Sequence, residues 1–170
     1  MTVFDLQLKA DLENVTDLLP VEDTESDTAY TWFIKFQCGS CHETTENPVA
    51  ICRNVRTRKE FSPISGSRGE ANLVMSCKFC KRESSASISG PPQSYTKNGE
   101  FATVTQIECR GIDPVAFEPR GEWKAKSAES NSRFTFSLDE NEWYDYDDDA
   151  GETVSVSNIE AQFVRGRQQK

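Results

Sequence analysis

The chain has 170 residues, a net charge of −9 and a hydrophobic content of 36% that includes ten Phe and three Trp. This length predicts one domain, or two small units that share a core. Mean hydropathy is −0.64, and no apolar run approaches the roughly 20 residues that a membrane-spanning helix needs. No secretory signal is expected, because residues 1–5 lead directly into strand-like alternation with an early acid and no basic segment. We therefore expect no membrane span, a cytoplasmic location with the nucleus as the alternative, and six cysteines that are reduced thiols or metal ligands.

The first half of the chain predicts strands joined by polar turns. Apolar and polar residues alternate over 3–12, with Leu6, Leu8 and Leu12 on one face, as in a half-buried strand. Residues 14–20 are expected to lead out of this strand. Further strands are expected at 29–37, 49–55, 71–77 and 84–89, with exposed loops at 21–28 and 56–69 and a boundary at Gly90-Pro91-Pro92.

The second half begins with Asn98-Gly99, a tight-turn signal. Strands are predicted at 101–109 and 154–164, where polar and apolar residues again alternate. Ser137 followed by Glu140 is a capping box, which predicts a short helix through Trp143 and Tyr144. Residues 145–152 are so acidic that we expect them to lie in solvent.

Many short strands with at most one short helix predict an all-β sandwich or barrel-like body. When the chain is shifted by 99 residues, Gln7-Leu8 falls on Gln106-Ile107 and Pro20 falls on Pro119. The sequence therefore predicts a single β domain over 1–170, with an internal duplication of two related β units at 1–90 and 98–170. The alternative is that any two exposed strands show this much similarity.

Two CxxC motifs are the strongest chemical signal in the sequence. Cys38 and Cys41 form the first, Cys77 and Cys80 the second, and 35 residues separate them. A tight turn directs both thiols of such a motif at one point, and two motifs supply the four thiolates of a tetrahedral Zn²⁺ site. The usual gap in a zinc ribbon is about 15–20 residues, so the longer gap predicts additional strands between the motifs. We expect one structural Zn²⁺ per chain.

The charge is unevenly distributed. Residues 1–30 contain one Lys and eight acids, and 139–152 contain eight acids and no base, whereas 53–82 contain eight bases and two acids. Cations near the second CxxC motif are expected to offset the negative charge of a zinc bound by four thiolates. The alternative is that they bind an acidic partner or phosphates. The overall acidity argues against general nucleic-acid binding.

The remaining candidates have simpler structural interpretations. His42, the only histidine, is expected to be a turn residue because four thiols are already available. Cys52 and Cys109 lie in strand patterns, where a free cysteine behaves as a small hydrophobe. The acids between 145 and 149 lack the glycine and the closing Glu of a calcium loop. Trp143 and its neighbouring tyrosines suggest either core packing or a strip that binds a partner.

Several segments resemble the CXXC-motif-containing zinc-binding protein family, a eukaryotic group long uncharacterised. These segments are LQLKADLENVTDL (6–18), CGSC (38–41), SRGEANLVMSCKFC (67–80), IECRGIDPVAFEP (107–119) and EWYDYD (142–147). The resemblance implies a mostly β fold of two related units and one zinc held by the paired cysteines. It implies no established enzymatic activity.

Three functions are compatible with the sequence. The first is a non-enzymatic, zinc-stabilised β protein, expected to be monomeric, that binds other proteins. The second is a metal-handling protein that holds and transfers Zn²⁺ or Cu(I), since soft thiolates favour both. The third is thiol–disulfide chemistry at Cys38 and Cys41. A redox CxxC usually opens a helix that lowers the thiol pKa, and residues 42–48 do not predict a helix, so we favour the first.

Overall fold

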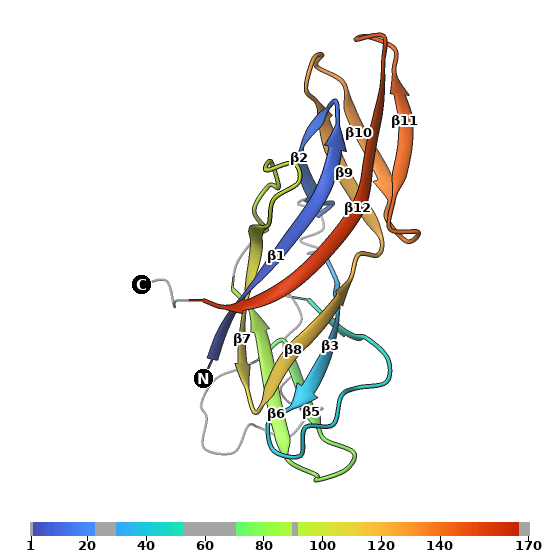
Figure 1. Cartoon of the computed structure of the whole chain (residues 1–170). Coiled ribbons are helices and arrows are strands. Elements are labelled where there is room, and N and C mark those ends of the chain that lie inside the picture. The colour runs from blue at the N-terminus through green and yellow to red at the C-terminus, as the bar shows by residue number, and fades with distance from the viewer. Residues whose placement is uncertain (1, 23–29, 53–70, 90–91, 167–170) are drawn as a thin grey trace.

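The structure is a computed structural model that describes residues 2–22, 30–52, 71–89 and 92–166. Within these ranges it is all-β, with no helix (Figure 1). The described residues therefore include no helix that could span a membrane. The strands are β1 (Thr2–Glu13), β2 (Val15–Pro20), β3 (Trp32–Cys38), β4 (Val49–Ile51), β5 (Leu73–Ser76), β6 (Glu83–Ile88), β7 (Ala102–Arg110), β8 (Ile112–Glu118), β9 (Glu122–Ser127), β10 (Arg133–Ser137), β11 (Trp143–Asp147) and β12 (Glu152–Arg165).

The largest sheet has six antiparallel strands in the order β11-β12-β1-β7-β6-β5. Its long strands β1 and β12 curve along the molecule, and the register of β1 shifts once against each neighbour (Figure 1), as expected for bulges that bend a strand. Leu6, Leu8 and Leu12 are buried on one face of β1, which confirms the predicted alternation. Phe4 pairs with Arg165, so the two ends of the chain lie side by side.

Two three-stranded sheets, β10-β9-β2 and β4-β3-β8, complete a single body with one continuous core. An aromatic cluster joins these two sheets. Trp32 on β3 packs edge-on against Trp123 on β9 with ring centroids 6.4 Å apart, and both are at most 1% exposed. The Trp123 indole N–H donates to the Tyr30 hydroxyl at 3.2 Å. Truncating a buried Trp to Ala typically costs about 3–5 kcal/mol, so this cluster is a major source of stability.

The strand order is symmetric about the boundary between β1 and β7. β6 and β5 extend the sheet beyond β7 as β12 and β11 extend it beyond β1, and β4-β3-β8 corresponds to β10-β9-β2. Backbone hydrogen bonds repeat as well: the Gly39 N–H donates to the Gly111 carbonyl at 2.9 Å, and the Ala128 N–H donates to the Asn14 carbonyl at 3.0 Å. We call β3–β8 the first unit and β9–β12 with β1 and β2 the second unit.

This grouping differs from a division at residue 90. The first unit is continuous in sequence, whereas the second is assembled from the two ends of the chain. That the units arose by duplication stays a prediction. The predicted loops at 21–28 and 56–69, the end of the predicted strand 49–55 and the predicted boundary at residues 90–92 lie wholly or partly outside the described residues.

The predicted helix after Ser137 is wrong. Residues 139–142 form a turn that joins β10 to β11, and the Asp139 N–H donates to the Ser137 hydroxyl at 3.2 Å. Asn141 has φ +67°, which interrupts a right-handed helix. Trp143 instead stacks on Phe136 of β10 with ring centroids 4.0 Å apart. Burial of these rings therefore outweighs the local capping signal.

Two further expectations also need correction. Residues 14–20 do not simply lead out of the first strand, because Asn14 at φ +57° makes a tight turn into β2. The acidic segment 145–152 is not wholly solvated, because Asp147 ends β11 and is only 1% exposed. Its neighbours Tyr144 and Tyr146 are exposed, as expected for this segment.

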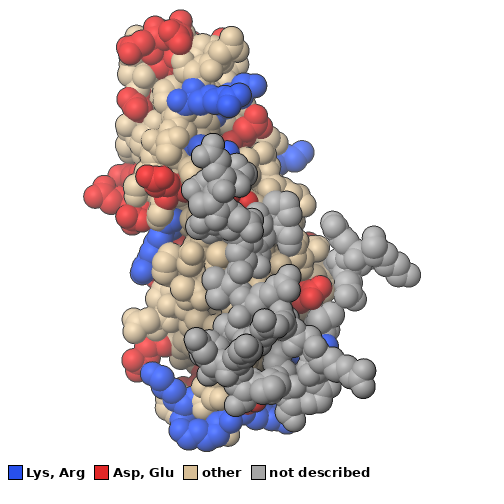
Figure 2. All heavy atoms as spheres, turned by 180° about the vertical axis from the view of Figure 1, so that it is seen from behind, with Lys and Arg blue, Asp and Glu red and all other residues tan. Residues whose placement is uncertain are grey.

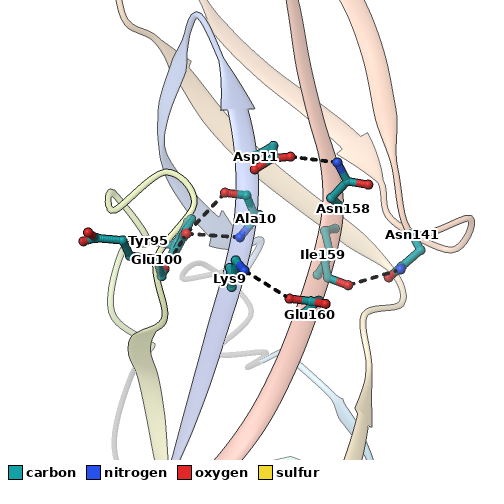
Figure 3. Close-up of polar contacts among 9 residues, drawn as sticks. All are labelled: Lys9, Ala10, Asp11, Tyr95, Glu100, Asn141, Asn158, Ile159 and Glu160. Atoms are coloured by element: carbon teal, nitrogen blue, oxygen red, sulfur yellow. Dashed lines mark hydrogen bonds and ion pairs between the residues drawn. The ribbon is translucent and has the colours of Figure 1, made fainter.

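Residues 92–101, which lead into β7, lie beside β1 and are joined to it by hydrogen bonds (Figure 3). The Tyr95 hydroxyl accepts a hydrogen bond from the Ala10 N–H at 3.0 Å and donates to the Glu100 carbonyl at 2.7 Å. On the other side of β1, Lys9 pairs with Glu160 of β12 at 3.5 Å (Figure 3). Tyr95 is fully buried, so this contact connects the first unit to the second inside the core.

Candidate metal centre

Both CxxC motifs form the same tight turn. β3 ends at Cys38, whose N–H donates to the Glu43 carbonyl at 2.8 Å while its carbonyl accepts from the His42 N–H at 3.0 Å. The second turn follows β5 and repeats this pattern at Cys77, which bonds Arg82 at 2.9 Å and Lys81 at 3.0 Å. His42 and Lys81 both have positive φ, +63° and +65°. His42 is therefore an exposed turn residue rather than a member of the thiol cluster.

The two turns bring all four predicted cysteines together. The Sγ atoms of Cys38, Cys41, Cys77 and Cys80 lie within 4.8 Å of one another. The shortest contacts cross from one turn to the other, at 3.6 Å between Cys38 and Cys80 and 3.5 Å between Cys41 and Cys77. Four sulfurs bound to zinc at about 2.3 Å in a tetrahedron would be separated by about 3.8 Å. The donor set and its spacing therefore fit a tetrahedral Zn²⁺.

The turns also stabilise thiolates. Backbone N–H groups of Cys41 and Ser40 donate to the Cys38 sulfur and lower its pKa from 9.0 to about 6. The N–H groups of Cys80 and Phe79 lower the pKa of Cys77 in the same way. The Glu43 N–H acts in this direction on Cys41, but burial and the neighbouring sulfurs raise its pKa to about 12. Four adjacent thiols cannot all ionise without a cation, and zinc supplies that charge.

The cluster lies at one end of the molecule and is partly open to solvent. Cys38 is buried, Cys41 and Cys77 are half-buried, and Cys80 is exposed. Exposed Lys78, Lys81 and Arg82 surround the second turn, and Figure 2 shows basic side chains gathered at this lower end and acidic ones at the opposite end. These cations offset the negative charge of a four-thiolate site. The other bases of the predicted basic patch, from Arg53 to Arg68, lie outside the described residues.

A groove of about 410 Å³ lies beside the cluster. Phe36, Pro48, Met75 and Ile112 line its apolar part, together with Cys38, Cys77 and acidic residues of the 43–46 segment. Phe79, at the tip of the second turn, also lines the groove and is 67% exposed. A large aromatic ring is therefore presented to solvent next to the metal centre.

The other candidate residues lie away from this cluster. Cys109 is buried in β7, and burial raises its pKa to about 12, so it is an inert core thiol as expected. Cys52 is half-buried just after β4. Sequence reasoning missed a polar cluster at the other end, where Asp147 accepts hydrogen bonds from Ser127 at 2.6 Å and Ser130 at 2.8 Å. The only signal was a Ser-x-x-Ser spacing that matches the CxxC spacing.

The fold and the site define an all-β protein in which two CxxC turns converge to form a four-cysteine metal site. The model of the eukaryotic CXXC motif containing zinc binding protein family matches residues 5–164. The chain belongs to this family.

Similar proteins cover nearly the whole chain. The CXXC motif containing zinc binding protein of Bos taurus is 38% identical over 97% of this chain and 99% of its own length. That of Homo sapiens is 36% identical over 94% and 96%. The crystal structure of C1orf123 superposes with a TM-score of 0.84 at 35% identity, covering 96% of this chain and 99% of that one. A hypothetical protein from Plasmodium falciparum has the same fold, with a TM-score of 0.77 at 22% identity over 96% of this chain and all of that one.

Proposed function

We propose that this protein is a non-enzymatic, monomeric zinc module that binds other proteins next to its metal centre. One Zn²⁺ per chain is held by Cys38, Cys41, Cys77 and Cys80. The single observation that supports the metal site is the convergence of four Sγ atoms at near-tetrahedral spacing. Metal-ligating cysteines must stay reduced, which supports a reducing, cytoplasmic location, with the nucleus as the alternative.

The partial packing of β5 supports a structural role for zinc. All four residues of β5 are half-buried or exposed, and β5 is the edge strand of its sheet. Apolar burial therefore contributes little to holding the second CxxC turn in place. Structural zinc can contribute about 10 kcal/mol or more to folding, which is sufficient to order this edge.

The protein-binding role rests on the groove and on Phe79. An exposed aromatic ring beside an apolar groove is typical of a binding surface, because aromatic residues are enriched in interfaces and their burial excludes water. The partner is a protein segment that places an apolar side chain in the groove. Lys78 lines the groove and the exposed Lys81 and Arg82 follow it in the same turn, which favours a segment with acidic flanks.

Metal transfer is the second candidate, because the site is partly open. Cys80 is exposed, and the cluster lies at an end of the molecule rather than inside the core. A partner thiol could reach the metal there. A redox role has less support, since the described residues that follow Cys41 form a turn and a bridge rather than a helix.

Native mass spectrometry with metal analysis tests the zinc site and separates the first two roles. A structural site retains one zinc per chain in the presence of a strong chelator, and β structure is lost only when the metal is removed. A site for transfer exchanges rapidly with isotopically labelled zinc while the fold persists. Absence of metal, with Cys38 and Cys41 oxidised, would instead indicate thiol–disulfide chemistry.

Affinity capture with matched variants tests protein binding. Phe79→Ser should remove specific partners, whereas Tyr144→Ser, which also exposes a hydroxyl in place of a solvent-facing ring at the other end, should retain them. Both variants should keep full metal content. Equal capture by the two variants would show that the groove is not the binding surface.

A further inference from the structure

The turns at the acidic end of the molecule have the same geometry as the CxxC turns. The Ser127 N–H donates to the Ser132 carbonyl at 2.8 Å, as the Cys38 N–H donates to Glu43. The Gly151 N–H donates to the Asp147 carbonyl at 2.8 Å, as the Lys81 N–H donates to Cys77. These turns join β9 to β10 and β11 to β12, which are the symmetry counterparts of β3, β4, β5 and β6.

Strand pairing fixes the correspondence residue by residue. Ser127 pairs with Val15, the first residue of β2, as Cys38 pairs with Ile112, the first residue of β8. Asp147 and Glu152 are paired at the turn between β11 and β12. Cys77 and Arg82 hold the equivalent positions at the turn between β5 and β6, where the Cys77 N–H donates to the Arg82 carbonyl. In the second unit, Ser127 and Ser130 occupy the positions of Cys38 and Cys41. Asp147 and Ala150 occupy the positions of Cys77 and Cys80.

The first residue of each turn accepts the same pair of backbone hydrogen bonds. The Ser127 hydroxyl accepts from the N–H groups of Glu129 and Ser130 at 3.2 and 2.9 Å. One Asp147 carboxylate oxygen accepts from Asp149 and Ala150 at 3.1 and 3.3 Å. At the other end, N–H groups two and three residues on donate to the sulfurs of Cys38 and Cys77. The second unit therefore has the backbone of a metal site without its thiols.

Asp147 joins the two turns at its end of the molecule, as the sulfur cluster joins the two CxxC turns at the other end. Its second oxygen accepts hydroxyl hydrogen bonds from Ser127 and Ser130 of the opposite turn at 2.6 and 2.8 Å. Ser132 adds a third hydroxyl bond across the turns, to Asp149 at 2.8 Å. The Ser127 hydroxyl, which is the largest influence, and the other donors lower the pKa of Asp147 to about 2. A carboxylate that only accepts hydrogen bonds can join two turns that approach from different sheets.

We propose that Ser127, Ser130, Asp147 and Ala150 occupy a second, latent metal position, in which the Asp147 carboxylate joins the two turns in place of a metal. The turns at the two ends of the molecule (Figure 1) are then held together in different ways. A metal joins them at the cysteine end, and the Asp147 carboxylate joins them at the opposite end. This position lies at the end opposite the cysteine cluster and does not depend on which metal the cysteines bind.

The first test installs the missing thiols. The variant Ser127→Cys, Ser130→Cys, Asp147→Cys, Ala150→Cys should bind one more equivalent of Zn²⁺ or Co²⁺ per chain than the unmodified protein, and the Co²⁺ form should show additional tetrahedral thiolate absorption. The matched control carries only Ser127→Cys and Asp147→Cys, supplies two thiols in place of four and should bind the extra metal much more weakly. A folded four-cysteine variant with no additional metal would overturn the latent position.

The second test needs no metal. It tests whether Asp147 joins the two turns even if the four-cysteine variant does not fold. Asp147→Ala should speed amide hydrogen exchange in the 128–132 and 148–151 turns by about tenfold or more, since charged hydrogen bonds are lost there. Exchange in the CxxC turns and metal content should stay unchanged. Asp148→Ala, which removes an exposed carboxylate one residue on, is the control and should change neither end. Unchanged exchange in Asp147→Ala would show that the carboxylate does not fasten the turns.

Discussion

Tyr95→Phe is expected to destabilise the protein by removing one oxygen from the contact between the two units. The hydroxyl is the partner of the Ala10 N–H at 3.0 Å and of the Glu100 carbonyl at 2.7 Å. Ala10 is fully buried and sits at the register shift between Lys9 and Asp11 of β1, so no strand neighbour replaces the lost acceptor. The Ala10 carbonyl keeps its bond from the Gly99 N–H at 2.8 Å.

An unsatisfied buried N–H costs about 1–3 kcal/mol, and loss of the partly exposed Glu100 bond costs roughly another 0.5–1 kcal/mol. We therefore expect Tyr95→Phe to lower the free energy of unfolding by about 1.5–4 kcal/mol. For a chain of this length the thermal midpoint should fall by about 3–16 °C.

Urea unfolding followed by circular dichroism measures this change as a lower midpoint with an unchanged slope. Tyr144→Phe is the control, because Tyr144 is 63% exposed and its hydroxyl donates to the exposed Glu142 carboxylate. It should stay within about 0.5 kcal/mol of the unmodified protein. If Tyr95→Phe lowered the free energy of unfolding no more than Tyr144→Phe does, the Ala10 N–H would have another partner and the reasoning would be wrong.

Three further predictions concern the cysteines and Asp147. Cys77→Ser should lose bound metal and the ordered β5–β6 edge, because one thiolate of the four is gone; metal analysis with circular dichroism checks this, and retained metal and native signal would contradict it. Cys109→Ala and Cys52→Ala should keep full metal content and cost only about 1–2 kcal/mol in packing, measured by urea unfolding. Because its hydrogen bonds lower the pKa of Asp147 from 3.8 to about 2, this carboxylate stabilises the fold above pH 4, and that contribution is lost as the pH falls from about 4 to about 2. Asp147→Asn should therefore show a shallower loss of stability in this range than the unmodified protein, and equal slopes would contradict the prediction.

The sequence predicts β1, several strands of the first unit and the cysteine cluster because each depends on a local pattern. Alternation at Leu6, Leu8 and Leu12 records burial on one face of β1, and CxxC spacing records a tight turn. Neither pattern depends on knowing which strands are neighbours, so both can be read without the structure.

Features of the second unit depend on distant partners and could not be predicted in this way. The capping box at Ser137 favours a helix over a few residues. Stacking of Trp143 on Phe136 instead stabilises the turn that joins β10 to β11. In the sequence Asp147 is indistinguishable from the neighbouring acids. Its role depends on hydrogen bonds from Ser127 and Ser130, which lie in a distant turn. The symmetry was obscured as well, because the counterpart of the continuous first unit is split between the two ends of the chain.

This split has a consequence for synthesis on the ribosome. β1 and β2 emerge first, but the second unit's other strands begin only at Glu122, after the whole first unit has been made. The first unit can complete its own pairings and acquire its metal while β1 and β2 still have unpaired edges. Closing the second unit requires contacts across almost the entire chain, such as Phe4 with Arg165, and such long-range closure is slow. We therefore expect the metal-binding unit to fold before the other and to provide β7 as the strand on which β1 aligns.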